Sequence, residues 1–414
     1  MNPPALTPID EALARLLDQL PQQAASRTET VKLKNALGRI LAEEVVATID
    51  VPPHANSAMD GYAVRATETS TNTSALPISQ RIAAGQVGEF LESGSCARIF
   101  TGAPLPAGAD AVVMQENCES DDDGIRVLKP VIAGENVRPA GADIKKGSSL
   151  FAAGRRLRPQ DLGALASLGL TTLSVVKPLR VALMTTGDEL QRPGVSLQPG
   201  QIYDSNFTTL IALLSALGME VIDCGRVGDT LESTLKALRA AAQEVDCVIT
   251  TGGVSVGEED HVRAAIEQIG ELKLWKLAVK PGKPFAFGAI NQVNNTGVGC
   301  QFFGLPGNPV SAFATFALLV RPALLAMQGA TELTPRRFAV SAGFERAESG
   351  ARQEYMRACL TESEGELRAE PLANQSSGVA ASLSRSDGLL IVPPHTKIER
   401  GDSLWFIPFS ELGS

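Results

Sequence analysis

Between residues 179 and 329, strand-like and helical patterns alternate along the chain, and this alternation constrains the fold more than any other feature. The strand-like runs are Arg180–Met184, Glu220–Val227, Asp246–Thr250, Leu272–Val279 and Gln301–Leu305. The helical patterns are Ser205–Leu217, Thr230–Gln243, Glu259–Ile269 and Pro309–Gln328. Strands and helices that alternate at this spacing form βαβ units. We therefore predict an α/β domain with a mostly parallel sheet and helices on both faces.

The remaining chain has a different pattern. Thr7-Pro8-Ile9-Asp10 is typical of a helix start with Thr7 as the cap, and a second helical segment is expected to end near Glu43. From Val45 to about Asn136, short β-type runs alternate with Gly, Pro and Asp turns, which indicates a small all-β unit. The stretch from 159 to 168 is helical again, and the chain after Gly329 is strand-like.

These patterns predict a multidomain protein, α/β with all-β subdomains. A mixed linking domain, partly helical, would consist of residues 1–46 together with 139–178, because the second segment could fold back on the first. A small β domain would cover 47–138, the α/β domain 179–329 and a C-terminal β domain 330–414.

Composition narrows the range of functions. The net charge is −9 and Lys and Arg form no run, so a general binder of nucleic acid or acidic membrane is not expected. The first residues lack the basic start and apolar core of a signal peptide, and no apolar run reaches about 18 residues. We expect a cytoplasmic protein that holds any anionic ligand in a local pocket.

The loops that follow the predicted strands are the first candidates for a binding site. They are residues 185–190, 228–230, 250–260 and 305–311, and the carboxyl ends of parallel strands meet at one edge of a sheet. Gly252 and Gly253 allow backbone N–H groups to approach a ligand closely. Pro309 after Asn308 is typical of a helix start that exposes further donors. This combination suits a phosphate group.

Four acids, Asp188, Glu189, Asp229 and Asp260, also follow predicted strands. Clustered carboxylates repel one another unless a cation lies among them, and hard oxygen ligands beside phosphates suit Mg²⁺. The alternative is that Asp229 caps a helix and that residues 258–260 form a solvated acidic turn.

Two lysines and two turns complete the candidates. Lys276 and Lys280 would share one face of a strand and form an anion clamp, or they guard a solvated edge strand. The all-β part contributes small-residue turns that carry Asp60 and Thr101, to which spacing alone assigns no role.

Together these segments resemble the molybdopterin molybdenumtransferase family, which includes the E domain of gephyrin. The resemblance runs from about residue 8 to 400 in a constant order. Its motifs are Asn56–Val64 (NSAMDGYAV), Thr101–Pro106 (TGAPLP), Asn136-Val137-Arg138 with Gly141 and Asp143, Thr186–Leu190 (TGDEL), Ile202–Asn206 (IYDSN), Thr251–Asp260 (TGGVSVGEED), Lys280–Pro284 (KPGKP) and Leu305–Ser311 (LPGNPVS).

The resemblance implies a fold and a reaction. Members have four subdomains around a molybdopterin-binding α/β sheet and form an elongated homodimer, with the active cleft between one subunit's α/β domain and parts of the other. The implied activity inserts molybdate into adenylylated molybdopterin, releases AMP and gives molybdenum cofactor, with Mg²⁺ as cofactor. A molybdopterin adenylyltransferase and molybdoenzyme-maturation proteins are implied as partners, with no role for nucleic acid or membrane.

Roles transfer to this chain only by motif position. The implied catalytic residues are Asp60, Thr101, Glu189, Asp229, Lys276 and Lys280. The implied substrate-binding residues are Arg138, Asp143, Asp188, Gly252, Gly253, Ser255, Asp260, Pro306, Pro309, Arg357 and Ser377. The implied metal ligands are Glu189, Asp229 and Asp260, and some of the site would come from the partner chain. Arg138, Lys276 and Ser377 are the residues expected nearest the molybdate.

Two alternatives remain at this point. The first is the adenylyltransferase that makes the adenylylated pterin, whose fold resembles residues 179–329 alone and needs none of the chain outside them. The second is a scaffold that binds peptides, as the E domain of gephyrin does, although this chain lacks the long disordered linker of such scaffolds.

Overall fold

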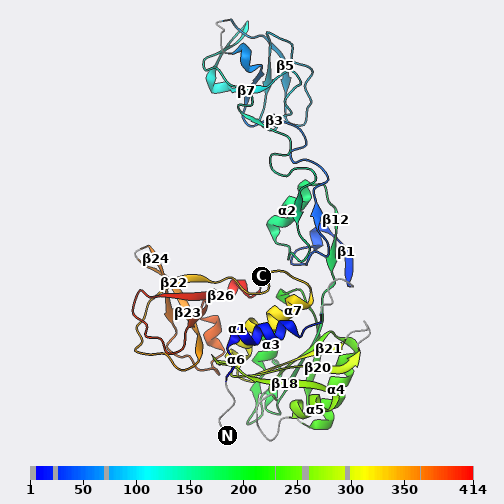
Figure 1. The fold of residues 1–414 in the computed structure, drawn as a ribbon, viewed down its shortest axis with the longest axis vertical. Coiled ribbons are helices and arrows are strands. Elements are labelled where there is room, and N and C mark those ends of the chain that lie inside the picture. Colours follow the sequence, from blue (N-terminus) through cyan, green and yellow to red (C-terminus); the bar gives the residue numbers. More distant parts are fainter. Residues whose placement is uncertain are drawn as a thin grey trace.

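The computed structural model describes residues 6–21, 27–69, 74–228, 230–253, 261–293, 299–363 and 365–413. The molecule is elongated (Figure 1). Strands β3, β5 and β7 lie at one end of the long axis, and the α/β sheet with the C-terminal strands lies at the other. The segment that contains β1, β12 and α2 lies between these two ends.

The α/β part contains a six-stranded sheet in the order β16-β13-β17-β21-β20-β18. Its parallel strands are β13 (Arg180–Thr186), β16 (Glu220–Val227), β17 (Cys247–Thr251) and β21 (Gly299–Leu305). Strands β18 (Gly270–Lys276) and β20 (Pro284–Val293) pair antiparallel at one side. The predicted mostly parallel sheet is confirmed, but the sequence patterns did not predict β20.

Helices cover both faces of this sheet, as predicted. One face packs against α1 (Ile9–Asp18), α3 (Ser205–Ala216) and a continuous helical stretch made of α6 (Pro309–Thr315), the π-helical turn η5 (Phe316–Val320) and α7 (Arg321–Met327). The other face packs against α4 (Leu231–Glu244) and α5 (His261–Ile269). The stretch Pro309–Met327 is long and apolar enough to cross a membrane by composition, but 89% of it is buried inside the protein.

Two local predictions near the N-terminus are wrong. Helix α1 has Pro8 as its cap, because Thr7 is used in a bridge to Leu277 and its N–H donates to the carbonyl of Lys276 (2.8 Å). The helical segment expected to end near Glu43 is only a short 3₁₀ turn, η2 (Leu33–Asn35). The residues after it pair with the returning chain instead, so tertiary pairing outweighs local propensity there.

That returning chain folds back on the N-terminal segment, as expected. Strand β1 (Thr28–Lys32) pairs with β12 (Thr172–Val176), and β2 (Val45–Val46) pairs with β11 (Ser149–Phe151). Helix α2 (Pro159–Ser167) lies between these two pairings in the chain and packs its Leu165 into the same core as Leu41 and Val175.

The stretch between β2 and β11 is built from strands and short 3₁₀ turns, in agreement with the predicted all-β unit. A four-stranded sheet in the order β5-β6-β4-β7 forms its centre. Its strands are β4 (Gly61–Val64), β5 (Ile78–Ile82), β6 (Cys96–Ile99) and β7 (Ala111–Met114). Strand β3 (Asn56–Ser57) pairs with β10 (Val137–Arg138), and β8 (Cys118–Asp121) forms a hairpin with β9 (Gly124–Val127). The 3₁₀ turns are η3 (Ala66–Glu68) and η4 (Gln115–Asn117).

The C-terminal strands form a β-barrel, in agreement with the predicted C-terminal β structure. The strands are β22 (Phe338–Ala342), β23 (Gln353–Ser363), β24 (Glu366–Pro371), β25 (Gly388–Val392) and β26 (Ser403–Pro408). Pairing between β23 and β25 closes the sheet on itself. The short elements α8 (Ala381–Ser384) and η6 (Phe409–Glu411) flank β25 and β26, and β19 (Val279–Lys280) of the α/β part adds to β23.

Asp161 gives the linking segment a pH-dependent stability. Its side chain is buried and accepts hydrogen bonds from Arg155 Nη2 (2.7 Å) and from the backbone N–H of Arg158 (3.0 Å). Burial acts to raise the pKa of Asp161, but the bonds and charges of both arginines outweigh it and lower that pKa to about 2. The carboxylate therefore stabilises the folded state above its unfolded pKa of 3.8, and this stabilisation is lost as the pH falls towards 2.

We predict that Asp161→Asn lowers the free energy of unfolding at pH 7 by about 2 kcal/mol. The deficit relative to the unmodified chain should shrink as the pH falls from 3.8 towards 2. Urea unfolding of both chains at several pH values measures it. Asp121→Asn, at an exposed pair with Arg126 (3.3 Å), is the control and should change little. A deficit independent of pH would contradict the assignment.

Candidate functional site

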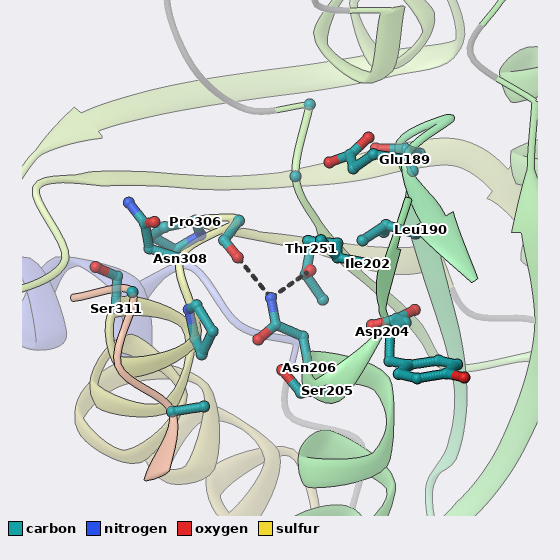
Figure 2. Close-up of a pocket in the computed structure, with 18 of the residues that line it drawn as sticks. Glu189, Leu190, Ile202, Asp204, Ser205, Asn206, Thr251, Pro306, Asn308 and Ser311 are labelled. Carbon is teal, nitrogen blue, oxygen red and sulfur yellow. Dashed lines mark hydrogen bonds between the residues drawn. The ribbon is translucent and has the colours of Figure 1, made fainter. Parts of the chain in front are cut away.

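A cavity of about 680 Å³ opens where strands β13, β17 and β21 end (Figure 2). The expected loops after β13, β17 and β21 meet there, whereas the described residues of the loop after β16 are absent from the lining. The lining residues are Thr186, Glu189, Leu190, Ile202, Tyr203, Asp204, Ser205, Asn206, Thr251, Gly252, Gly253, Pro284, Pro306, Gly307, Asn308, Pro309, Ser311, Gly378 and Ala380. The short strands β14 (Leu190–Gln191) and β15 (Ile202–Tyr203) form one wall.

Asn206 connects three of the segments that line the cavity. It lies in the first turn of α3, whose cap Asp204 accepts from the N–H of Phe207 (3.0 Å). The Asn206 amide Nδ2 donates to Thr251 Oγ1 (3.1 Å) and to the carbonyl of Gly307 (2.7 Å), drawn as dashed lines in Figure 2. One side chain therefore joins the start of α3 to the ends of β17 and β21.

The turn after β17 requires glycine. Gly252 and Gly253 have φ values of +84° and +64°, a region that L side chains rarely adopt. A Cβ on Gly253 would also lie 2.7 Å from Val262 Cγ2. The N–H of Gly252 donates to the carbonyl of Leu305 (3.1 Å), so this turn lies against the loop after β21. The backbone is thereby exposed to the cavity with no side chain in the way.

The charged side chains of the lining are acidic. They are Glu189 and Asp204, and no Lys or Arg occurs among the lining residues that the structure describes. Asp204 is buried and engaged as a helix cap. The exposed carboxylate of Glu189 folds back over Gly187, where a Cβ would lie 2.5 Å from Glu189 Oε2, and within the described ranges it has no hydrogen-bond or ion-pair partner. An anionic ligand would therefore need cations from elsewhere.

The structure places the sequence-predicted residues in separate groups. Those that line the cavity are Glu189, Gly252, Gly253, Pro306 and Pro309. Asp188 is exposed on the same turn as Glu189 but is not part of the lining. Asp229, Ser255 and Asp260 lie outside the described residues.

The expectation that Lys276 and Lys280 share one strand face is wrong. Strand β18 ends at Lys276, and Lys280 belongs to β19, which pairs with β23 of the barrel. The Nζ of Lys280 lies 3.4 Å from Oε2 of Glu354, a buried carboxylate that also pairs with Arg346 (2.8 Å). Lys276 stands in register with Pro284, a lining residue, so its strand end borders the cavity.

Arg357 and Ser377 lie beside the cavity. The Arg357 side chain is 1% exposed, and its guanidinium donates to Ser382 Oγ (3.0 Å) and to the carbonyls of Asn374 (3.1 Å) and Ser376 (3.0 Å). The carbonyl of Ser377 accepts from the N–H of Val310 (3.0 Å). Arg357 therefore positions the loop that seats Ser377 against the first turn of α6.

A second group, Asp60, Thr101, Arg138 and Asp143, is absent from the cavity lining. These residues belong to β10 or to loops that follow β3, β6 and β10 in the chain. Strand β3 lies at the end of the long axis opposite β21 (Figure 1). Asp60 Oδ1 accepts from the backbone N–H (2.8 Å) and the hydroxyl (2.7 Å) of Thr101. Arg138 in β10 is exposed and stands opposite Asn56. Asp143 is exposed, and its N–H donates to the carbonyl of Val51 (2.9 Å). Within a single chain, these four residues therefore do not line the cavity.

The sequence patterns assigned no role to the lining residues Asp204, Asn206 and Ser311, and they named Asn308 only as the residue before a helix start. The signal for them was present, because they belong to the segments IYDSN and LPGNPVS. Asp204 and Asn308 stand directly before α3 and α6, where a short polar side chain predicts a cap, and such caps lie at the ligand end of α/β sheets. Asn206 and Ser311 lie inside these helices, so the cap pattern does not extend to them.

Fold and cavity together define a multidomain α/β protein with a large cavity at the carboxyl edge of its sheet. Family models match in chain order: the MoeA N-terminal region (domain I and II) over residues 7–169, a probable molybdopterin binding domain over 182–326, and the MoeA C-terminal region (domain IV) over 339–409.

Individual relatives agree. A molybdopterin molybdenumtransferase of Haemophilus influenzae is 37% identical over 98% of this chain and 99% of its own length. One from Staphylococcus aureus is 31% identical over 93% and 91%. The crystal structure of a molybdopterin biosynthesis MoeA protein from Pyrococcus horikoshii superposes with a TM-score of 0.80 at 30% identity, over 98% of this chain and 100% of that one. The chain belongs to the molybdopterin molybdenumtransferase family, which confirms the resemblance seen in its motifs.

We predict that Asn206→Ala loosens the cavity. Loss of both amide bonds should lower the free energy of unfolding by about 1–3 kcal/mol, because the Gly307 carbonyl and the Thr251 hydroxyl lose their donor. Urea unfolding measures the stability, and hydrogen exchange at the loops after β17 and β21 reports the loosening. Gln243→Ala, an exposed amide on α4, is the matched control. Unchanged exchange in both loops would contradict the assigned role.

A second prediction concerns Asp60. The backbone N–H of Thr101, followed by its hydroxyl, holds the pKa of Asp60 below its ordinary value of 3.8. Thr101→Ala removes only the hydroxyl bond, so the pKa of Asp60 should rise part of the way back. A carboxyl NMR titration of the full chain measures the shift. Thr69→Ala, whose buried hydroxyl bonds the carbonyl of Ala66 (2.8 Å), should leave the pKa of Asp60 unchanged.

Proposed function

We propose that this chain inserts molybdate into adenylylated molybdopterin, with release of AMP and formation of molybdenum cofactor. Membership of the molybdopterin molybdenumtransferase family supports the general statement that the chain is an enzyme of molybdenum cofactor biosynthesis. We further propose that the pterin substrate is adenylylated, that the reaction requires Mg²⁺ and that the residues have the roles given below.

The cavity at the ends of β13, β17 and β21 carries this proposal. Its volume of about 680 Å³ is in the range of sites that bury a cofactor-sized molecule. In the glycine turn after β17 the N–H of Gly252 is used by the carbonyl of Leu305, whereas the N–H of Gly253 donates no hydrogen bond within the described residues and can approach a phosphate. Pro309 begins a buried helix that also lines the cavity. Cleavage of a phosphoanhydride needs positioning and charge neutralisation more than a strong nucleophile. The cavity offers positioning without supplying positive charge.

A magnesium ion would supply part of that charge. Of the proposed ligands the structure describes Glu189, whose carboxylate lies at the cavity without a described partner and suits a hard cation. Within the described residues no cluster of three His, Cys, Asp or Glu side chains could hold a metal. The proposal therefore also assigns Asp229 and Asp260, which lie outside those residues, as ligands. When bound, the ion would neutralise the phosphate charge and polarise the scissile bond.

A second copy of the chain belongs to the proposal as well. Asp60, Thr101, Arg138 and Asp143 have assigned roles but are absent from the cavity lining of their own chain. A homodimer in which one chain presents this group to the other's cavity would complete the site. A cytoplasmic location, and contacts with a molybdopterin adenylyltransferase and molybdoenzyme-maturation proteins, stay predictions.

AMP release tests the function. The purified full chain is given adenylylated molybdopterin, with molybdate and Mg²⁺ each present or omitted, and AMP is measured together with active cofactor. We expect both products only when both ions are present. AMP release without cofactor would contradict the transferase reaction. Consumption of ATP with bare molybdopterin would instead indicate an adenylyltransferase, and no turnover with the pterin still bound tightly would indicate a binding protein.

The same assay tests Glu189. We predict that Glu189→Gln lowers the rate of AMP release by about 100-fold and raises the Mg²⁺ concentration needed for half-maximal rate, because the neutral amide is a poorer ligand. Glu232→Gln, an exposed acid in the first turn of α4, is the matched control and should behave as the unmodified chain. An unchanged Mg²⁺ dependence in Glu189→Gln would remove Glu189 from the metal site.

A further inference from the structure

Two arginines contact one aromatic ring in the four-stranded sheet β5-β6-β4-β7. The guanidinium carbon of Arg81 lies 4.5 Å from the centroid of the Phe100 ring, and that of Arg98 lies 4.7 Å from the same centroid. Arg98 also lies 5.1 Å from the ring centroid of Tyr62. Arg81 and Arg98 are direct partners in the register of the parallel strands β5 and β6, so their side chains leave the same face of the sheet.

This arrangement places like charges side by side. Directly opposed like charges on neighbouring strands destabilise a sheet. Neither guanidinium forms an ion pair with a described carboxylate, and only the weaker, longer-range attraction between Arg98 and Asp60 offsets part of that repulsion. Arg98 is fixed through neutral acceptors, the carbonyl of Gly61 (2.9 Å) and Oε1 of Gln115 (2.6 Å). Arg81 is exposed and donates no hydrogen bond within the described residues, so its guanidinium is available to a ligand.

Protection of a sheet edge does not explain the pair. β5 is an edge strand, and a charged residue such as Arg81 commonly blocks edge-to-edge pairing. Arg98, however, lies on β6, which is flanked by β5 and β4. Stacking on Phe100 also holds both guanidinium groups in fixed positions, which favours recognition of a particular anion over general repulsion.

We propose that Arg81 and Arg98, held against Phe100, form a binding site for a dianionic oxyanion. Planar guanidinium groups bind tetrahedral oxyanions through paired charge-assisted hydrogen bonds. An oxyanion bound by both guanidinium groups would offset the repulsion between their positive charges. Phosphate and molybdate share the required charge and shape.

The site lies next to the group assigned to catalysis. Phe100 directly precedes Thr101, whose N–H and hydroxyl hold Asp60. Arg98 acts on Asp60 through its charge, adding to the stronger effects of the two Thr101 bonds. The cavity lining described above contains Glu189 and Asp204 and no described cation, whereas the proposed substrates are all anions. This assignment rests on the proposed function. In it, Arg81 and Arg98 of one chain are the cations that meet the anionic substrates at the cavity of a second copy.

Equilibrium binding to the full chain tests the site without requiring turnover. Labelled molybdate and labelled AMP are each dialysed against the unmodified chain and against Arg81→Gln and Arg98→Gln. We expect each variant to weaken binding of at least one oxyanion about tenfold or more. Loss confined to molybdate identifies the oxyanion as molybdate, and loss confined to AMP identifies it as the substrate phosphate. Unchanged binding of both oxyanions by Arg81→Gln would overturn the proposal.

Controls separate this result from misfolding and from the proposed function. Arg126→Gln removes an exposed arginine in the nearby hairpin, paired with Asp121 (3.3 Å), and should bind both oxyanions as the unmodified chain does. Arg81 makes no described hydrogen bond, so its variant should fold even if Arg98→Gln does not. Absence of AMP release by the unmodified chain would reject the proposed function, while the dialysis would still decide the oxyanion site.

Discussion

Parallel alignment of β13, β17 and β21 determines where this protein can bind a ligand. Because the strands run in one direction and share a register, Thr186, Thr251 and Leu305 reach the same edge of the sheet. Each strand is almost entirely buried, so a shift of register would expose apolar side chains and is resisted by the whole core. The loops after these strands therefore start close together, and a few hydrogen bonds, such as those of Asn206, are enough to hold them around a cavity.

The strands of this sheet could be predicted because their burial leaves continuous apolar runs between turn residues. Strand β20 could not, because it begins at Pro284 and follows a Pro- and Gly-rich turn. The helix expected near Glu43 failed for a different reason: Ile40 and Leu41 pair with residues more than a hundred positions later, which no local pattern records. The separation of Lys276 from Lys280 has the same origin, since β19 leaves one sheet to join another.

The candidate site was predictable in position more than in chemistry. Loops at strand ends indicated the cavity, and the motif resemblance supplied the identity of the ligand class. The roles of single residues were harder to predict. Arg357 carries a positive charge that suits an anion, and yet its buried guanidinium donates to backbone carbonyl groups. Asn206 shows the reverse case, a neutral side chain whose importance depends on two acceptors that only the folded chain brings near.

The length of the molecule also has a kinetic consequence. Strand β3, which Asp60 follows in the chain, and strand β21, whose end borders the cavity with Glu189, lie towards opposite ends of the long axis (Figure 1). The two ends are joined through the two-stranded ladders β1–β12 and β2–β11. A reaction that used both residues in one site would require two chains for every working centre. Its rate at low protein concentration would rise with the square of that concentration, and an inactive variant of one end would be rescued by mixing it with an inactive variant of the other.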